Sequence, residues 1–108
     1  MPEEGSYTLD IRPTFVEELD AAVRYIEGTL RNPLAADRLV EKVFEAIDLR
    51  LFSPESFAPC YREPDVKQPY YSIPVGNFEI YYIVRGRTME VRWFRYGKSV
   101  RPLMPFSK

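Results

Sequence analysis

Histidine is absent from the 108 residues of this chain, and cysteine occurs once, as Cys60. The absence of histidine excludes Ser-His-Asp and Cys-His catalysis, histidine-ligated metals and any imidazole general base. A single cysteine forms no internal disulfide and no cysteine-ligated zinc site, so we expect Cys60 to be a small buried apolar residue. The sequence therefore predicts a protein without a metal and without a cofactor.

Long apolar runs are also missing, and the first five residues are acidic where a signal peptide would be basic. These features predict a cytoplasmic protein that does not enter a membrane. The chain length allows one domain with one core. Its content of 45% hydrophobic and 29% charged residues is typical of a globular protein and excludes wholesale disorder.

Charge is unevenly distributed along the chain. Residues 1–69 carry 14 acidic and 8 basic side chains, whereas residues 70–108 carry 2 acidic and 7 basic ones. The net charges of these two parts are −6 and +5, although the whole chain has a net charge of −1. A basic end in a nearly neutral chain favours contact with an anionic partner, but the same imbalance also arises without any function.

A strand and a helix are predicted at the start. Residues 7–12 alternate apolar and polar side chains, as a half-buried strand does, with Tyr7, Leu9 and Ile11 facing inward. Thr14 and Glu17 have the spacing of a capping box at the start of the following helix, and Gly28 or Asn32 should end that helix. Its solvated outer face should consist of Glu17, Glu18, Asp20, Arg24 and Glu27.

A second amphipathic helix should begin with Asn32 as its N-cap and Pro33 at its first position, and should end at Ser53-Pro54. The connection between the two helices is short, so an antiparallel helix hairpin is expected. Residues 53–69 contain four prolines and no periodicity, which indicates a long loop. Phe57, Cys60 and Tyr61 should attach this loop to the body of the protein.

Three meandering strands should complete the chain, because Gly76-Asn77 and Gly86-Arg87 are typical of type II′ hairpin turns. Each turn sets a register that places apolar residues opposite one another. The first hairpin then pairs Tyr71, Ile73 and Val75 with Tyr82, Ile80 and Phe78. The second pairs Phe78, Ile80, Tyr82 and Val84 with Arg95, Trp93, Val91 and Met89. Only the pair that ends in Arg95 is not apolar on both sides.

These elements predict an α+β fold of order β-α-α-β-β-β, in which the helix hairpin packs on one face of a small, mainly antiparallel twisted sheet. Tyr82 and Trp93 should lie in the core. Pro74 places its strand at an edge of the sheet or at a bulge. The opposite face should be open and should present Tyr70, Tyr81, Phe94 and Tyr96 among arginines, which suggests a binding surface unless residues 99–108 fold back over it.

Four of the basic residues after the last turn form a candidate cluster, namely Arg92, Arg95, Lys98 and Arg101. One interpretation is a strip that binds an anion or a target. The alternative is a solvated sheet edge at which one arginine pairs with Glu79 or Glu90.

Several short motifs resemble the RelE/ParE superfamily of toxins from type II toxin–antitoxin modules, also called plasmid stabilisation proteins. They are Tyr25-Ile-Glu, residues 32–39 (Asn-Pro-Leu-Ala-Ala-Asp-Arg-Leu), residues 75–82 (Val-Gly-Asn-Phe-Glu-Ile-Tyr-Tyr) and Arg95-Tyr-Gly-Lys98. Together with the predicted order of elements, these motifs extend the resemblance over roughly residues 7–104. The chain looks closer to the ParE-like branch of the superfamily. It implies a toxin domain over 7–104, with an extended or disordered segment at 1–6 and a tail at 105–108.

The resemblance implies a cytoplasmic toxin that a cognate antitoxin neutralises in a hetero-oligomer, with antitoxin binding as a central property. In the ParE branch the target is DNA gyrase, which is poisoned through protein–protein contact. In the RelE branch the target is mRNA in the ribosome, cleaved by a set of lysines, arginines and a late Tyr or His. Much of that set is missing here, because Ser72, Pro74, Glu79, Ser99 and Phe106 occupy its positions. A third interpretation is an inactive member that retains antitoxin binding only.

The candidate residues follow from these interpretations. Catalytic candidates for a ribonuclease are Arg92, Lys98, Tyr96 and Glu79. A tyrosine such as Tyr81 or Tyr96 would serve as a base only with a strongly lowered pKa. The residues expected to bind the target or the antitoxin are Tyr81, Arg92, Phe94, Arg95, Tyr96, Lys98 and Arg101.

Overall fold

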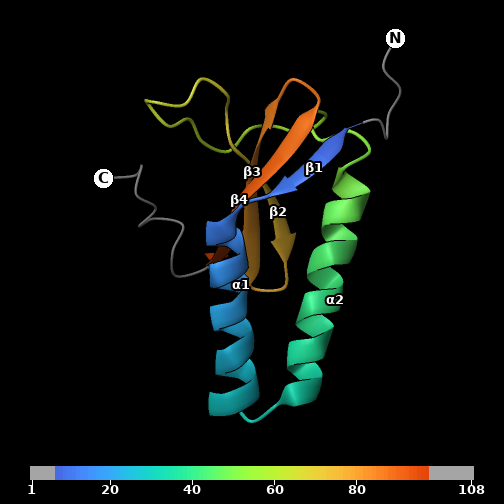
Figure 1. The fold of residues 1–108 in the computed structure, drawn as a ribbon, viewed down its shortest axis with the longest axis vertical. Coiled ribbons are helices and arrows are strands. Elements are labelled where there is room, and N and C mark those ends of the chain that lie inside the picture. Colours follow the sequence, from blue (N-terminus) through green and yellow to red (C-terminus); the bar gives the residue numbers. More distant parts are fainter. Residues whose placement is uncertain (1–6, 98–108) are drawn as a thin grey trace.

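The computed structural model describes residues 7–97 (Figure 1). Its elements are β1 (Thr8–Ile11), α1 (Pro13–Arg24), the π-helical turn η1 (Tyr25–Thr29), α2 (Pro33–Arg50), β2 (Tyr71–Val75), β3 (Phe78–Arg85) and β4 (Thr88–Tyr96). The predicted order β-α-α-β-β-β and the α+β class are confirmed. The predicted N-terminal segment 1–6, the candidates Lys98 and Arg101, and the tail 105–108 lie outside the described residues.

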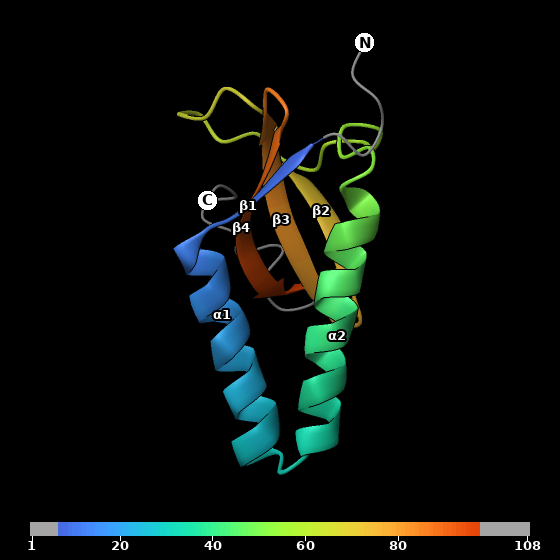
Figure 2. The same ribbon diagram turned by 45° about the vertical axis from the view of Figure 1, so that its right-hand side comes forward.

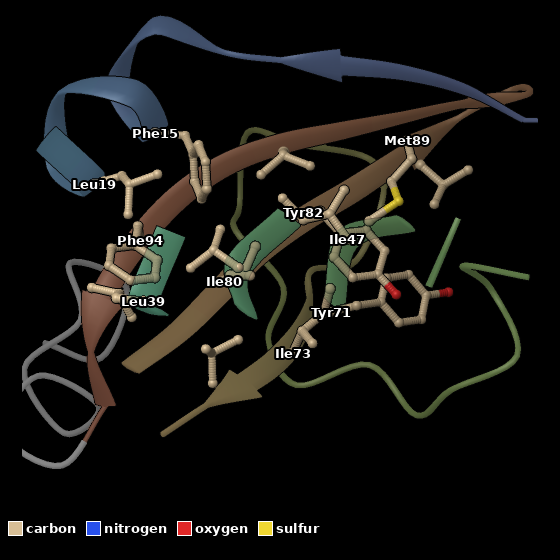
Figure 3. Packing of buried hydrophobic residues seen from close by; sticks show 14 residues of the cluster. Phe15, Leu19, Leu39, Ile47, Tyr71, Ile73, Ile80, Tyr82, Met89 and Phe94 are labelled. Carbon is tan, nitrogen blue, oxygen red and sulfur yellow. The ribbon is translucent and has the colours of Figure 1, made fainter. Parts of the chain in front are cut away.

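One four-stranded sheet carries both helices on the same face. The strand order is β1-β4-β3-β2, with β1 parallel to β4 and the other neighbours antiparallel. Figures 1 and 2 show α1 and α2 side by side, joined at the end far from the N-terminus of α1. Helix α1 contacts β4, and α2 contacts β2. The buried layer between helices and sheet contains Phe15, Leu19, Leu39, Val43, Ile47, Ile73, Ile80, Tyr82, Met89, Val91 and Phe94 (Figure 3).

The first helix begins without the predicted capping box. Helix α1 starts at Pro13, and no side chain caps its first amides. Pairing of β1 with β4 extends to Arg12, whose N–H donates to the carbonyl of Val91 at 2.9 Å. The helix therefore begins directly after the strand, at a proline whose fixed φ suits the first helical position. Thr14 already lies inside the helix and is not its N-cap.

The hairpin end between the helices differs from the prediction, while the start of α2 matches it. Neither Gly28 nor Asn32 ends the first helix, because a π-helical turn continues through Gly28 to Thr29. Arg31 then takes a positive φ of 53°. Asn32 is the N-cap of α2, as predicted, and its side chain accepts a hydrogen bond from the amide of Ala35 at 3.1 Å.

Both predicted hairpin turns are confirmed. The closing pairs are Val75 with Phe78 and Arg85 with Thr88. Gly76 and Gly86 have φ values of 59° and 60°, whereas the residue after each glycine does not have a positive φ. This combination is that of a type II′ turn, which needs glycine at its first central position. The register of the first hairpin is therefore the predicted one throughout β2.

The register of the second hairpin changes part-way along β4. Tyr82 pairs with Val91 but Tyr81 pairs with Trp93, so Arg92 is an extra residue in a β-bulge. Beyond the bulge, the residues that face the helices are shifted by one. The structure here corrects the predicted faces of Trp93, Phe94, Arg95 and Tyr96. Phe94, expected on the open face, is 3% exposed in the core opposite Ile80, and Trp93, expected in the core, lies on the other face.

The bulge has a clear physical reason. Without it, Arg95 would point into the core opposite Phe78, and an unpaired guanidinium is costly to bury. With it, Tyr96 pairs with Phe78, and Phe94 stacks on the Phe78 ring at a centroid distance of 4.7 Å. Figure 3 shows Phe94 among the labelled core residues.

The face that was predicted to be open is covered. Tyr70, Tyr81 and Ile83 are buried there, and Tyr61 and Val66 of the loop between α2 and β2 pack on them. The cover is therefore the long loop, and a short bridge between Tyr61 and Tyr70 holds the loop in place. Cys60 lies beside this bridge but is exposed, so the prediction of a buried cysteine was wrong.

Arg50 connects the start of the same loop to the core through hydrogen bonds and a ring contact. Its Nη1 donates to the hydroxyl of Tyr82 at 2.8 Å and to the carbonyl of Ser72 at 3.3 Å. Its guanidinium also lies 3.5 Å from the centroid of the Phe57 ring. The Tyr82 hydroxyl donates to the carbonyl of Pro54 at 2.7 Å, and burial raises the pKa of Tyr82 to about 12. The end of α2, strand β2 and the loop thus form one connected unit.

Candidate functional site

The covered face carries an aromatic stack with an arginine bonded to it. The rings of Tyr70 and Trp93 lie parallel at a centroid distance of 4.6 Å. Arg92 Nη1 donates to the Tyr70 hydroxyl at 2.7 Å, and that hydroxyl donates to Glu63 of the loop at 3.0 Å. Arg92 therefore helps to hold the loop on the sheet in addition to any role in binding.

Tyr81 is buried beside this stack, with its ring tilted by 56° against that of Trp93. Its hydroxyl donates to Glu79 Oε1 at 3.2 Å. Burial is the main cause of the raised pKa of Tyr81, and it also raises the pKa of Tyr70. A phenol with a raised pKa stays protonated at neutral pH and is a poor general base. Tyr81 consequently does not have the lowered pKa that RNA cleavage would require of it.

Arg95 is held by a carboxylate from the first helix. Its Nε donates to Glu18 Oε2 at 2.9 Å, and its guanidinium lies 4.9 Å from the Trp93 ring centroid. The other oxygen of Glu18 accepts a hydrogen bond from the Phe94 amide at 2.8 Å. Strand β1 ends at Ile11, so the outer edge of β4 beyond that residue has no neighbouring strand. Glu18 accepts a hydrogen bond from a backbone amide at this edge.

A second carboxylate, Glu90, lies among three arginines. Its oxygens are 3.1 Å from Arg85 Nε, 3.6 Å from Arg92 Nε and 3.8 Å from Arg12 Nε. Arg12 also contacts Asp10 at 3.3 Å. Arg92 therefore makes the contact with Glu90 that the alternative interpretation expects, and it retains N–H donors for an anion. The cluster still carries more positive than negative charge.

The predicted binding residues do not form one surface. Arg92, Arg95 and Tyr81 lie on the covered face, whereas Phe94 lies in the core. Tyr96 is 41% exposed at the end of β4 and makes an edge contact with Phe78. Glu79 is 8% exposed and packs against Gly97. A Cβ atom added to Gly97 would lie 3.0 Å from the Cγ atom of Glu79.

A recess that could receive a partner lies elsewhere, between the helix hairpin and the β2–β3 turn. It has a volume of about 400 Å³. Its apolar lining comes from both layers, and basic side chains from α2 border it. The lining residues are Ile26, Asn32, Leu34, Ala35, Arg38, Leu39, Lys42, Val75, Gly76, Asn77 and Phe78. We call this recess the hairpin groove.

The hairpin groove has an apolar floor and a positive rim. Leu34 is 59% exposed on its wall, although it is a large apolar residue. Arg38 and Lys42 are four residues apart on α2 and so lie on the same helix face, one turn from each other. Such a surface suits a segment that presents apolar residues together with acidic ones.

Comparison with known proteins gives the family. Residues 9–97 match the family model described as "ParE toxin of type II toxin-antitoxin system, parDE". The chain belongs to the ParE toxin family. A search among curated proteins finds no significant match for this ParE-family chain.

Two solved structures are similar to this ParE-family chain. A chain of the chromosomal ParDE TA system from P. aeruginosa superposes with a TM-score of 0.67 at 16% sequence identity, covering 83% of this chain and 95% of that one. A chain of the RelB–RelE antitoxin–toxin complex from Methanococcus jannaschii has a TM-score of 0.48 at 23% identity, covering 89% of this chain and 99% of that one. At these identities, the first comparison supports the fold alone.

No helix within residues 7–97 combines the length and the apolar character needed to cross a membrane. Over the same residues, no three Cys, Asp or Glu side chains are placed so that they could hold a metal ion.

Sequence reasoning missed Glu18 and the basic rim of the hairpin groove. Glu18 was assigned to the solvated face, yet it follows Phe15 by three residues and so shares a face with the apolar stripe. This spacing was the available signal. Lys42 carries a similar signal, because it follows the groove-lining Leu39 by three residues, and Arg38 shares a face with Lys42. Their position opposite the β2–β3 turn depends on tertiary packing.

Replacing Glu18 with alanine should lower the free energy of unfolding by about 1–3 kcal/mol, because the Phe94 amide loses its acceptor and Arg95 its partner. Glu17→Ala is the matched control, since Glu17 is the exposed neighbour, and it should change stability by less than about 0.5 kcal/mol. Urea denaturation monitored by circular dichroism measures both. Equal effects of the two substitutions would contradict the assignment of Glu18 to the edge of β4.

Proposed function

We propose that this chain is a ParE-like toxin that inhibits growth by binding its target, DNA gyrase, and that a cognate antitoxin neutralises it in a hetero-oligomer. Membership of the ParE family supports the toxin assignment. The hairpin groove is the structural observation that supports the proposal, because it is an apolar recess with a charged rim, as binding sites are. On this account the protein acts in the cytoplasm, as members of such modules do.

The hairpin groove favours an antitoxin segment of defined chemistry. An amphipathic helix has apolar residues on one face, which suit the floor formed by Leu39, Val75 and Phe78. Acidic side chains one turn apart on that helix suit Arg38 and Lys42. The similar P. aeruginosa chain comes from a ParDE TA system, which is consistent with a protein partner for the family.

An antitoxin could also bind by adding a strand to the sheet. The two edge strands, β1 and β2, differ in how well they could pair with such a strand. Strand β2 is an edge, but Pro74 has no amide to donate, and Arg50 already binds the carbonyl of Ser72. Edge β1 (Thr8–Ile11) contains no proline. An extended antitoxin segment is therefore better accommodated at β1 than at β2.

The ion pairs and pKa values of the residues considered for RNA cleavage favour action through protein contact. Arg95 is paired with Glu18, and Arg92 with Tyr70 and Glu90. Tyr81 has a raised pKa, which disfavours the phenolate that a general base needs. The remaining binding candidates, Tyr96 at the end of β4 and the segment with Lys98 and Arg101, form the proposed contact with the target.

Expression of the chain without an antitoxin tests the target. We expect growth arrest with an induced DNA-damage response, and we expect the purified protein to inhibit DNA supercoiling by bacterial gyrase. Growth arrest with cleaved mRNA and unimpaired supercoiling would instead support the RelE-like ribonuclease. Normal growth with a folded, soluble protein would support an inactive member that only binds antitoxin.

The role of the hairpin groove is tested with two exposed leucines of α2. Leu34 lies in the groove, whereas Leu49 is 69% exposed outside it. Leu34→Asp should weaken binding to the antitoxin at least about tenfold, because it puts a charge on an apolar contact. Leu49→Asp is the matched control and should bind normally.

The partner for this measurement is the product of a short reading frame beside the gene, of about 80 residues with a DNA-binding N-terminal half. Binding is measured by calorimetry, and neutralisation by co-expression. Equal affinity of Leu34→Asp and Leu49→Asp for this partner would remove the hairpin groove from the proposal.

A further inference from the structure

A second cavity opens at the end of β1, away from the hairpin groove. Its volume is about 380 Å³, and it is lined by Arg12, Pro13, Thr14, Arg92 and Trp93. The lining residues come from the junction of β1 with α1 and from the bulge of β4. The bulge contributes directly, because it places Arg92 and Trp93 side by side on the same face of the sheet.

The two arginines of this cavity are held in place by the same carboxylate. Glu90 lies 3.8 Å from Arg12 Nε and 3.6 Å from Arg92 Nε. The Nη1 atoms contact Asp10 and the Tyr70 hydroxyl, respectively. Within residues 7–97, the hydrogen bonds of these two arginines use Nη1. A guanidinium has five N–H donors, so further donors of each arginine remain for a ligand. The side chains of Arg12 and Arg92 are thus fixed in position and still have N–H donors for a ligand.

The surrounding charge also favours an anion. Among the described residues, the lining of the cavity includes Arg12 and Arg92 but no carboxylate, so the lining itself carries an excess of positive charge. The first turn of α1 contains no acidic residue and has no side-chain cap. Its amides add a partial positive charge on the same side as Thr14. Two guanidinium groups with a hydroxyl form a donor set suited to tetrahedral oxyanions.

We propose that the cavity between Arg12 and Arg92 binds a phosphate group, as carried by a small phosphomonoester. Guanidinium donors match phosphate oxygens in geometry, and a monoester offers a dianion to the excess positive charge. The Trp93 ring is already engaged, by Tyr70 at 4.6 Å and by Arg95 at 4.9 Å. The site therefore recognises the phosphate itself and does not rely on stacking of a base. This proposal does not rest on the toxin function.

The intrinsic fluorescence of the protein tests this site directly, because Trp93 is the single tryptophan and lines the cavity. The full chain is titrated at constant ionic strength with inorganic phosphate, glycerol 3-phosphate and dimethyl phosphate, with chloride as the reference anion. We expect saturable changes for phosphate and for the monoester with Kd of about 1 mM, and weaker binding of the diester. Binding of the diester that equals or exceeds that of the monoester would overturn the monoester assignment in favour of a nucleic-acid backbone.

Two variants separate the site from general salt effects. Arg12→Gln should weaken phosphate binding at least about tenfold, whereas Arg24→Gln, an exposed arginine elsewhere on α1, should leave it unchanged. Thr14→Glu should abolish binding through repulsion, while an acid in the first turn maintains or raises thermal stability. A titration that does not saturate, or that responds equally in Arg12→Gln, Thr14→Glu and the unmodified chain, would overturn the phosphate site.

Discussion

The extra residue in β4 decides which side chains lie on each face of the sheet. A strand alternates its side chains, so one inserted residue exchanges the faces for everything beyond it. In this chain the insertion at Arg92 moves Phe94 under the helices, and it moves Arg95 out of the core to Glu18. The apolar layer stays continuous, and a charged side chain avoids burial without a partner.

The same bulge organises the opposite face and therefore the candidate sites. Trp93 joins Tyr70 in a stack, and the long loop covers that stack through Tyr61. A face that is covered in this way is no longer a broad binding surface. The cavity beside Arg12 lies at the margin of this face, whereas the hairpin groove lies on the helix side, between α2 and the β2–β3 turn. Each is formed where two elements distant in sequence meet, which is where small domains commonly offer pockets.

Local signals in the sequence predicted the start of α2 and both hairpin turns, but not the start or the end of the first helix. Asn32 caps α2, and Gly76 and Gly86 set two turns, because each of these residues acts on its immediate neighbours. The bulge was not predicted, although its signal was present: Arg95 was the one charged residue assigned to an apolar pairing. The cover provided by the loop had no local signal, since residues 53–69 lack periodicity and their position depends on tertiary contacts. The basic rim of the hairpin groove was not predicted either, because it depends on how α2 packs against the β2–β3 turn.

Cross-strand contacts in β3 and β4, measured as nuclear Overhauser effects between backbone protons, test the bulge most directly. The account predicts that Ile80 contacts Phe94 across the sheet while Tyr82 contacts Val91, so that the two strands differ by one residue between these pairs. Contacts of Ile80 with Trp93, together with the same Tyr82–Val91 contact, would mean an uninterrupted ladder. That result would place Arg95 on the helix side and would contradict the arrangement of the core and of the cavity beside Arg12.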